Sequence, residues 1–451
     1  MEPSVRPILD MNAYTARGGA EPPGTLLARR HANSGAASVL FYRDPIEMVR
    51  ASGCWMETAD GTRYLDFYNN VPSVGHGHPR VADAIARQVA TLNIHTRYLN
   101  RRTEDYVERL KATLPPTLSN VVLACSGSEA NDLALRVATA GTGGTGFIVT
   151  ETAYHGNTWA VTNISPSSFK IGTPPPYVCT VPPPAPAHVG ADVAGGFAAA
   201  VRAAIDTLNA RGHRPAALIC DSIFSSDGVF ADPPGFLAPA VEAVRVTGGL
   251  FIADEVQPGF GRTGDAFWGF ARHDVTPDMV TMGKPMANGY PMAGLATRPD
   301  LLTRFCQGVG YFNTFGGNPV AAAAGLAVLE VIAEEALQDN ARTVGAHVME
   351  RLRALSANDP RLAAVRGAGL FIGADLCQAD DPTRPDPALA SAVINGLCER
   401  RVLIGAAGRY GHTLKIRPPL CLTRAEADLF VDALTETLAT IPPGAARVRE
   451  M

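Results

Sequence analysis

Short apolar segments alternate with helical stretches through the middle of this chain, and this alternation constrains the fold more than any other feature. The segments "NVVLAC", "TGFIVTE", "AALICDSIF", "GGLFIADEVQ" and "MVTMGK" have the composition of buried strands, and each ends at small or polar residues. Between them, "FAAAVRAAIDTLNA" and "FLAPAVEAVRVTG" have helical periodicity. Alternating strands and helices predict an α/β fold with a largely parallel sheet that helices cover on both faces.

The flanking regions have a different pattern. Residues 174–192 contain seven prolines and predict an extended loop, and the glycine-rich run 140–146 predicts a plain connector between a helix and a strand. A helix is expected over about 320–356, followed by the strands "VRGAGLFIGADL", "RRVLIGAAG" and "TLKIRPPL" and by a final helix. We therefore predict a large domain over 75–330 and a small α+β domain built from 331–451 and the N-terminal segment 1–74.

Composition and charge exclude several classes of protein. A formal charge of −4 and a pI near 6.2 give no reason to expect nucleic acid or an anionic membrane as a partner. The start has no apolar core of the secretory type, and the apolar run 320–333 is too short to span a bilayer. The eight cysteines contain no CxxC pair, which favours reduced thiols in a cytoplasmic enzyme. "GHGHP" (75–79) is interpreted as a turn, so no metal site is predicted.

The motif "SGSEAND" (126–132) joins a strand to a helix and has two interpretations. It supplies free backbone N–H groups at a helix N-terminus, which is a ready anion site. It also fits an ordinary helix cap at Ser126 or Ser128, with Glu129 as the capping acid. The motif alone does not decide between them.

An acid and a lysine follow two neighbouring strands. Asp254 and Glu255 come after an apolar strand, where acids line a crevice in open parallel sheets, or where they are simply solvated. Lys284 comes 30 residues after Asp254, inside the apolar run "DMVTMGKPMANGYP". Pyridoxal phosphate needs a lysine that holds it as a Schiff base, an acid for its pyridine nitrogen and a dipole-rich pocket for its phosphate. The three motifs together suit this cofactor.

A family resemblance makes the match specific. The chain resembles the class III aminotransferases, which have the large pyridoxal-phosphate fold called type I, over nearly its whole length. The motifs "GSEAND", "AYHGNT", "FIADEVQPGFGRTG", "MVTMGKPMANGYP", "FNTFGGNP" and "LKIRPPL" occur in the family's order and at its spacing. The resemblance implies a mostly parallel seven-stranded sheet in the large domain and pyridoxal 5'-phosphate as the cofactor.

The resemblance also implies roles for individual residues. Lys284 would hold the cofactor and move the proton between substrate and cofactor, and Asp254 would pair with the pyridinium nitrogen. The remaining implied cofactor contacts are Gly127 and Ser128 at the phosphate, Tyr154 on the ring face with His155 beside it, Gln257 near the phenolic oxygen, and Thr314 at the neighbouring subunit's phosphate. A homodimer or a higher oligomer is therefore expected. For Tyr154, a core aromatic is the alternative.

Departures from the family pattern bear on the substrate. Where many class III enzymes have "RIAPPL", this chain has "LKIRPPL", so Lys415 takes the place of an arginine that binds the α-carboxylate. Lys415 and Arg417 would point to one face of a strand and offer two cations to the substrate, or they are a pair of surface charges. In "DSIFSSDG" (221–228), Asp221 replaces a glutamate and Ser226 replaces an acid. These changes argue against an α-amino acid or 4-aminobutyrate specialist.

The chain is most similar to the branch that contains phospho-lyases of phosphoethanolamine and phosphohydroxylysine, through "DPIEMVRASG", "YNNVPSVGHGHP" and "YFNTFGGNP". The leading hypothesis is amino transfer between a primary amine without a conventional α-carboxylate and a keto acid or aldehyde. An amino sugar in an antibiotic pathway is one such amine, by analogy alone. Elimination of phosphate from a phosphorylated amine is the alternative. A non-catalytic relative is disfavoured, because it should have lost the lysine or the acid.

Overall fold

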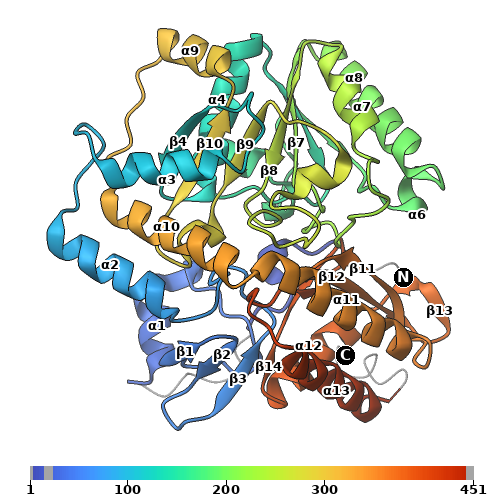
Figure 1. Ribbon diagram of the computed structural model, residues 1–451. Coiled ribbons are helices and arrows are strands. Elements are labelled where there is room, and N and C mark those ends of the chain that lie inside the picture. Colours follow the sequence, from blue (N-terminus) through green and yellow to red (C-terminus); the bar gives the residue numbers. More distant parts are fainter. Residues whose placement is uncertain (1–3, 15–23, 443–451) are drawn as a thin grey trace.

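The computed structural model describes residues 4–14 and 24–442 (Figure 1). Its large domain contains a seven-stranded sheet in the order β4-β10-β9-β8-β7-β5-β6. β10 pairs antiparallel with β4 and β9, whereas the other neighbouring strands of this sheet pair in parallel. The strands are β4 (Asn120–Ala124), β5 (Gly146–Thr150), β6 (Val178–Val181), β7 (Pro215–Cys220), β8 (Leu250–Asp254), β9 (Met279–Met282) and β10 (Ala293–Thr297). The expected mostly parallel sheet is confirmed.

Helices cover both faces of this sheet, because successive side chains of each strand point to opposite sides. On β5, Phe147 and Val149 pack with the buried residues of α4, whereas Ile148 packs with those of α7. α4 (Gly127–Thr142) covers one face, and α7 (Val193–Ala210) with α8 (Ala238–Arg245) covers the other. The other helices of this region are α2 (Pro79–Thr91), α3 (Arg101–Lys111), α5 (Trp159–Asn163), α6 (Pro186–Val189), α9 (Pro299–Gly308) and α10 (Pro319–Glu334).

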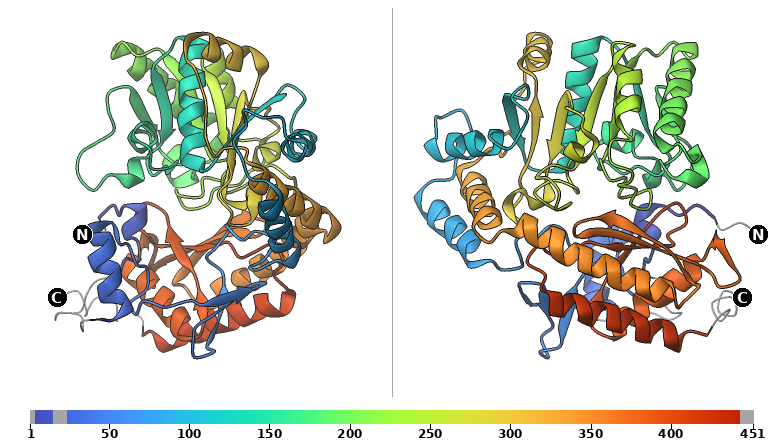
Figure 2. Two further views of the ribbon diagram at one scale, coloured as in Figure 1. Left: turned by 90° about the vertical axis from the view of Figure 1, so that its left-hand side faces the viewer. Right: turned by 45° about the vertical axis from the view of Figure 1, so that its right-hand side comes forward.

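The smaller α+β part combines both ends of the described chain (Figure 2). β14 (Val402–Leu403) pairs in parallel with β3 (Arg63–Asp66), so N-terminal and C-terminal segments share one sheet. Its remaining elements are α1 (Leu26–Ser34), β1 (Arg50–Ser52), β2 (Trp55–Glu57), α11 (Leu337–Ser356), β11 (Leu362–Ala368), β12 (Phe371–Gln378), β13 (Asp381–Pro385), α12 (Pro387–Glu399), β15 (Gly405–Ala407), β16 (Thr413–Ile416) and α13 (Arg424–Thr440). The domain boundaries at 74 and 330 stay a prediction, and segments 1–74 and 331–451 extend beyond the described residues.

Four local expectations were wrong. The segment "RRVLIGAAG" is not one strand but contains β14 and β15, which belong to different sheets. The proline-rich stretch 174–192 contains the edge strand β6 and the short helix α6, because the residues between its proline clusters keep the N–H groups that pair with β5. The single helix expected over 320–356 is two helices, α10 and α11, separated at Ala336, whose φ of 50° is left-handed. The segment "VRGAGLFIGADL" is not one strand but parts of the hairpin β11–β12, which turns at Gly369 with φ 54°. Helix α12 was not predicted.

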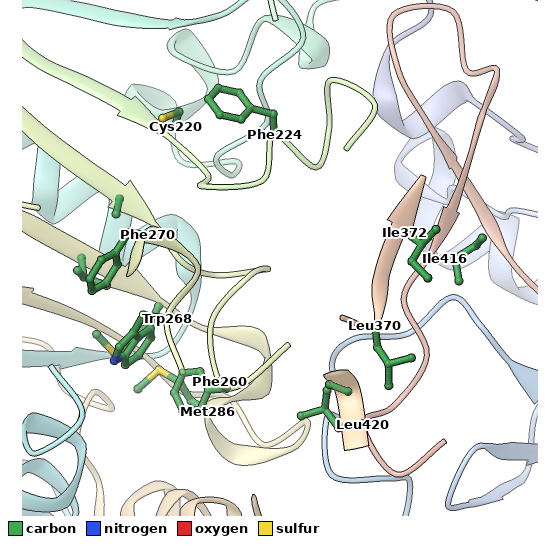
Figure 3. Packing of buried hydrophobic residues seen from close by; sticks show 14 of the residues in the cluster. Cys220, Phe224, Phe260, Trp268, Phe270, Met286, Leu370, Ile372, Ile416 and Leu420 are labelled. Carbon is green, nitrogen blue, oxygen red and sulfur yellow. The ribbon is translucent and has the colours of Figure 1, made fainter. Parts of the chain in front are cut away.

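One hydrophobic cluster runs from the large sheet into the smaller part and fixes their relative position. Figure 3 shows members from both sides, with Cys220, Phe260 and Met286 on the large-domain side and Ile372 and Ile416 on the other. All five side chains are at most 2% exposed. Because the carboxyl ends of β8 and β9 point toward this junction, residues that follow these strands lie between the two parts. Within the described part of the chain, no helix has the length and hydropathy needed to cross a bilayer.

Candidate active site

Lys284 lies directly after β9, at the start of a short 3-10 helix, Lys284–Ala287. Its φ of 30° is unusual for a residue with a side chain, and such backbone strain is found at functional sites. Burial first and the nearby Arg417 second lower the pKa of Lys284 to about 8, against the opposing effect of Asp254 and Asp221. The amine therefore loses its proton more readily than an ordinary lysine.

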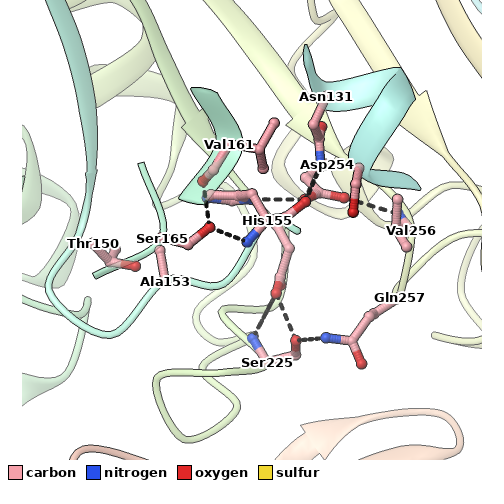
Figure 4. A network of polar contacts seen from close by, with 12 residues as sticks. Asn131, Thr150, Ala153, His155, Val161, Ser165, Ser225, Asp254, Val256 and Gln257 are labelled. Atoms are coloured by element: carbon pink, nitrogen blue, oxygen red, sulfur yellow. Dashed lines mark hydrogen bonds and ion pairs between the residues drawn. The ribbon is translucent and has the colours of Figure 1, made fainter. Parts of the chain in front are cut away.

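Asp254, the last residue of β8, is the centre of a buried polar network (Figure 4). Its side chain lies 2.7 Å from His155 Nδ1, and it accepts hydrogen bonds from Asn131 Nδ2 at 3.0 Å and Val256 N at 3.1 Å. His155 is also fixed through its main chain, which donates to Ser165 Oγ at 2.9 Å. The carboxylate of Asp254 is thus held in one orientation by three groups, which come from α4, from the loop after β5 and from the turn after β8 itself.

The N-terminus of α4 has both features that "SGSEAND" predicts, a helix cap and free N–H groups that can bind an anion. Ser126 and Glu129 form a capping box, so the expected cap is present. The N–H groups of Gly127 and Ser128 come before the first intrahelical bond and stay available at the helix end. Ser128 Oγ donates to Asn157 Oδ1 at 2.9 Å and accepts from Asn157 N at 3.1 Å. A Cβ at Gly156 would come within 2.4 Å of Ser128 Oγ, so glycine is required for this close approach.

A cavity joins these elements. It is lined by every cofactor contact that the sequence predicts except Thr314, and by the predicted substrate residue Asp221. The eleven lining residues are Gly127, Ser128, Tyr154, His155, Gly156, Asn157, Asp221, Asp254, Val256, Gln257 and Lys284. Tyr154 is half-buried at its wall, and burial raises the pKa of its phenol. The core-aromatic alternative for Tyr154 is therefore not supported by its position.

Gln257 and Asp221 connect the cavity to the loop 221–228, in which the sequence analysis named Asp221 and Ser226 but not Ser225. Gln257 Nε2 donates to Ser225 Oγ at 2.6 Å, and Ser225 Oγ in turn donates to Asp221 at 2.6 Å. Asp221 also accepts from the main chains of Ile223 and Ser225, and burial raises its pKa. Much of the hydrogen-bonding capacity of Asp221 is thus used within its own turn.

Lys415 and Arg417 are not a pair of surface charges. Lys415 is 2% exposed, and its ammonium lies 5.6 Å from the ring centroid of Phe371. Arg417 is half-buried, and its Nη1 donates to Gln257 Oε1 at 2.9 Å and to Asn70 Oδ1 at 3.1 Å. The pKa of Lys415 is well below its usual value because of burial first and repulsion by Arg417 second.

Thr314 lies elsewhere. It is exposed and does not line the cavity in this chain. Its role toward a neighbouring subunit therefore stays a prediction. Asn131, Ser225 and Asn70 are contacts that the sequence reasoning missed. For Asn131 a signal existed, since it lies one helical turn after Gly127 and Ser128 in the quoted motif. Ser225 lies in the quoted segment 221–228, but its bond to Gln257, like the bond of Asn70 to Arg417, depends on long-range packing.

Comparison with known proteins now decides the family. The model of the family "Aminotransferase class-III" matches residues 41–438. The chain belongs to the class-III aminotransferases. This class-III aminotransferase is 38% identical to the Drosophila melanogaster protein "Alanine--glyoxylate aminotransferase 2-like", over 91% of this chain and 86% of that protein. It is 36% identical to the Caenorhabditis elegans "Ethanolamine-phosphate phospho-lyase homolog 1", over 92% and 93% of the two chains.

A solved structure supports the same assignment. A phospholyase from Arthrobacter in complex with phosphoethanolamine is 43% identical and superposes with a TM-score of 0.88, covering 93% of this chain and 100% of that one. The class-III aminotransferase described here is therefore an enzyme that depends on pyridoxal phosphate, as its family does. When bound, pyridoxal phosphate binds an amine covalently and withdraws electrons from the neighbouring carbon.

The residues of the cavity fit this cofactor. A lysine with a lowered pKa and a fixed carboxylate border one cavity, and the end of a 16-residue helix supplies N–H donors for a phosphate. His155 Nε2 is buried without a hydrogen-bond partner among the described residues, so the network behind the carboxylate can still accept or donate one bond. The donor set therefore matches the three chemical needs of pyridoxal phosphate.

Proposed function

We propose that this enzyme removes phosphate from a small phosphorylated primary amine by elimination. The observation that carries the proposal is the proximity of three cationic side chains. Lys284 lines the cavity, and Arg417 donates to the cavity residue Gln257. Lys415 lies on β16, two residues before Arg417. Arg417 lowers the pKa of both lysines, and Lys284 also lowers that of Lys415. Like charges in a buried site repel each other, and a dianionic phosphate relieves that repulsion more than a carboxylate does.

Each residue has a stated role in this proposal. Lys284 anchors the cofactor and, once displaced by the substrate amine, its free amine takes the proton from the carbon next to that amine. Asp254 keeps the cofactor's ring nitrogen protonated, with His155 and Asn131 holding its carboxylate. Gly127 and Ser128 bind the cofactor phosphate through N–H and hydroxyl groups, with Tyr154 on the ring face and Gln257 near the phenolic oxygen.

The substrate phosphate is assigned to the other end of the site. Lys415 and Arg417 lie on and just after β16, and they offer two cations to the leaving phosphate. Gln257 accepts from Arg417 at 2.9 Å, so it links the cofactor side to the substrate side. Asp221 opposes the lysines electrostatically and orients the loop of Ser225. The phospho-lyase names of two similar proteins support the same chemistry.

Amino transfer is the second candidate, because the Drosophila relative carries an aminotransferase name. Both reactions use Lys284 and Asp254 in the same first proton transfer. They differ in whether the substrate carries a leaving group. Amino transfer, the leading hypothesis from the sequence, is therefore less favoured than elimination, because the cation cluster and the phospho-lyase relatives support elimination. An amino-sugar substrate and a role in antibiotic biosynthesis have no support among these relatives and stay predictions.

The test is a direct comparison of the two reactions. The purified holoenzyme is incubated with phosphoethanolamine, and released phosphate, ammonia and aldehyde are measured. In parallel it is incubated with alanine and glyoxylate or pyruvate, and keto-acid consumption is measured. We expect phosphate release without keto-acid consumption. Keto-acid consumption with no phosphate release would overturn the proposal in favour of amino transfer.

A matched pair of lysine variants tests the carrying observation. Lys415→Met is expected to lower phosphate release about tenfold or more, since a charge-assisted contact to the substrate phosphate is lost. Lys170→Met is the control, because Lys170 is exposed and pairs with Asp10 at the surface. Equal activity of both variants would show that Lys415 does not bind the substrate.

We further propose that the active unit is at least a dimer. Large apolar side chains are exposed at positions 98 and 99 and beside Thr314, with Leu99 at 98%, Phe315 at 70% and Tyr98 at 65%. Thr314 lies next to Phe315, so a second copy that covers this surface would receive Thr314 near its own cofactor site. A cytoplasmic location also stays a prediction, and the similar human and Arabidopsis thaliana proteins are named mitochondrial.

A further inference from the structure

Two cysteines from opposite ends of the chain meet in the smaller part of the molecule. Cys54 lies in the turn between β1 and β2, and Cys421 lies between β16 and α13. Their sulfur atoms are 3.7 Å apart, although 367 positions separate them in sequence. Cys54 is 2% exposed and Cys421 is half-buried. Folding thus brings two thiols into direct contact, and Cys421 is the more exposed of the two residues.

The main chains on both sides hold this contact in place. The turn at Gly53 exchanges two backbone hydrogen bonds with His76, at 3.0 and 2.8 Å. On the other side, Leu420 N donates to Ser73 O at 2.7 Å. A Cβ at Gly75, between these anchors, would come within 2.9 Å of Cys421 Sγ. The thiols are therefore packed against a fixed backbone and are not a chance approach of two mobile side chains.

The two thiols differ in reactivity. The hydrogen bond between the two thiols lowers the pKa of Cys421, which favours its thiolate, whereas the same bond and burial raise the pKa of Cys54. The buried guanidinium of Arg262 also interacts electrostatically with both sulfur atoms. The more accessible thiol is thus the better nucleophile, and the buried thiol is placed to react with it afterwards.

We propose that Cys54 and Cys421 form an oxidation site that peroxides convert reversibly into a disulfide. In the first step Cys421 loses its proton to solvent and its thiolate attacks a peroxide oxygen. The O–O bond breaks, Cys421 becomes a sulfenic acid, and the leaving alkoxide or hydroxide takes a proton from solvent and departs as an alcohol or water. In the second step Cys54 sulfur attacks Cys421 sulfur, and the hydroxyl leaves as water with the Cys54 proton. Two thiols are oxidised and one peroxide is reduced.

A disulfide between Cys54 and Cys421 would join the N-terminal segment to residues 417–421, two parts of the chain that otherwise contact each other only through non-covalent interactions. Cys421 follows Arg417 by four residues, and Arg417 N donates to Phe67 O at 3.0 Å, so residues 417–421 lie along the N-terminal segment. A bond between Cys54 and Cys421 closes a very long loop and removes conformational freedom from the unfolded chain. Oxidation therefore locks the segment that carries Arg417 to the N-terminal part of the same fold.

The test uses the holoenzyme and does not depend on the proposed reaction. The protein is treated with a limiting amount of hydrogen peroxide, free thiols are alkylated under denaturing conditions, and peptides are analysed by mass spectrometry. We expect a disulfide-linked pair of peptides containing Cys54 and Cys421, which dithiothreitol separates, and a thermal midpoint several degrees higher in the oxidised form. Oxidation of the exposed Cys306 with Cys54 and Cys421 still reduced would overturn the proposal.

Cysteine variants check the order of the steps. Cys54→Ser should leave a sulfenic acid on Cys421 that dimedone labels, whereas the wild type, which has the resolving thiol, should be labelled there far less. Cys398→Ser, which changes a half-buried cysteine elsewhere, should form the disulfide as the wild type does. If Cys54→Ser does not fold, dimedone is added while the wild type is oxidised, so that it labels the sulfenic acid on Cys421 before Cys54 reacts. Absence of dimedone label on Cys421 in both experiments would refute the mechanism.

Discussion

Replacement of Lys284 by methionine is expected to stabilise the cofactor-free protein at neutral pH. In that form the lysine carries an ammonium group in a site that disfavours it. Burial and the nearby Arg417 lower its pKa from 10.5 to about 8, although Asp254 and Asp221 act in the opposite direction. Lys284→Met removes the charge and keeps much of the side-chain volume.

The magnitude follows from the shift in pKa. A fall from 10.5 to about 8 corresponds to about 3 kcal/mol of lost stability when the lysine is protonated in both the folded and the unfolded state. This figure is an upper value, because the half-buried amine keeps some contact with solvent. Loss of the charge should therefore raise the free energy of unfolding by up to about 3 kcal/mol near pH 7.

The dependence on pH has a definite sign. Between pH 8 and 10.5 the unfolded chain binds the Lys284 proton more than the folded protein does, so wild-type stability rises with pH in this window. The advantage of Lys284→Met should accordingly shrink to about 1 kcal/mol near pH 10. A simple gain from added hydrophobic surface would be the same at both pH values.

The assay is urea denaturation of both proteins after the cofactor has been removed with hydroxylamine and dialysis. Free energies of unfolding near pH 7 and pH 10 are compared, and Lys170→Met serves as a control whose exposed lysine should show no such dependence. An advantage that is equal at both pH values, or a destabilised Lys284→Met at both, would refute the reasoning that the site strains a charged lysine.

Three further predictions concern other parts of the molecule. Asp254→Asn should lower kcat/KM about 10²- to 10³-fold with little change in the thermal midpoint, because a fixed charge is lost from the site while the amide keeps the shape; steady-state kinetics and melting curves check this. Gly345→Ala should destabilise the protein by about 2–3 kcal/mol in urea denaturation, because the new Cβ would lie 2.1 Å from Gly369 O, and Gly308→Ala, at an open position, is the control. Leu99→Ser should shift sedimentation toward the monomer if a second copy covers this side chain, which is 98% exposed, and an unchanged sedimentation coefficient at low protein concentration would contradict that surface.

The sequence predicted the family, the sheet and most of the cavity because these depend on local patterns. Gly127 and Lys284 each follow a strand within three residues and Asp254 is the last residue of one, and parallel strands place their carboxyl ends at one edge of the sheet. The order of the motifs then indicated one cofactor. The expectations that failed concern the proline-rich edge strand and the helix break at Ala336. Both have weak sequence signals, because they depend on pairing and packing with distant segments.

Tertiary structure alone decided which side chains are in contact and how burial and neighbouring charges change their pKa values. The sequence left Lys415 as either a substrate cation or a surface charge, and its packing over Phe371 from β12 removes the second possibility. The amino-acid sequence contains no signal that Cys54 lies against Cys421, because no local pattern links residues 367 positions apart. The sequence by itself determined which chemistry this chain can hold, since cofactor motifs are short and local. Burial and long-range contact, which exist only after folding, decided the pKa of Lys284 and brought the charges of Lys415 and Arg417 close to it.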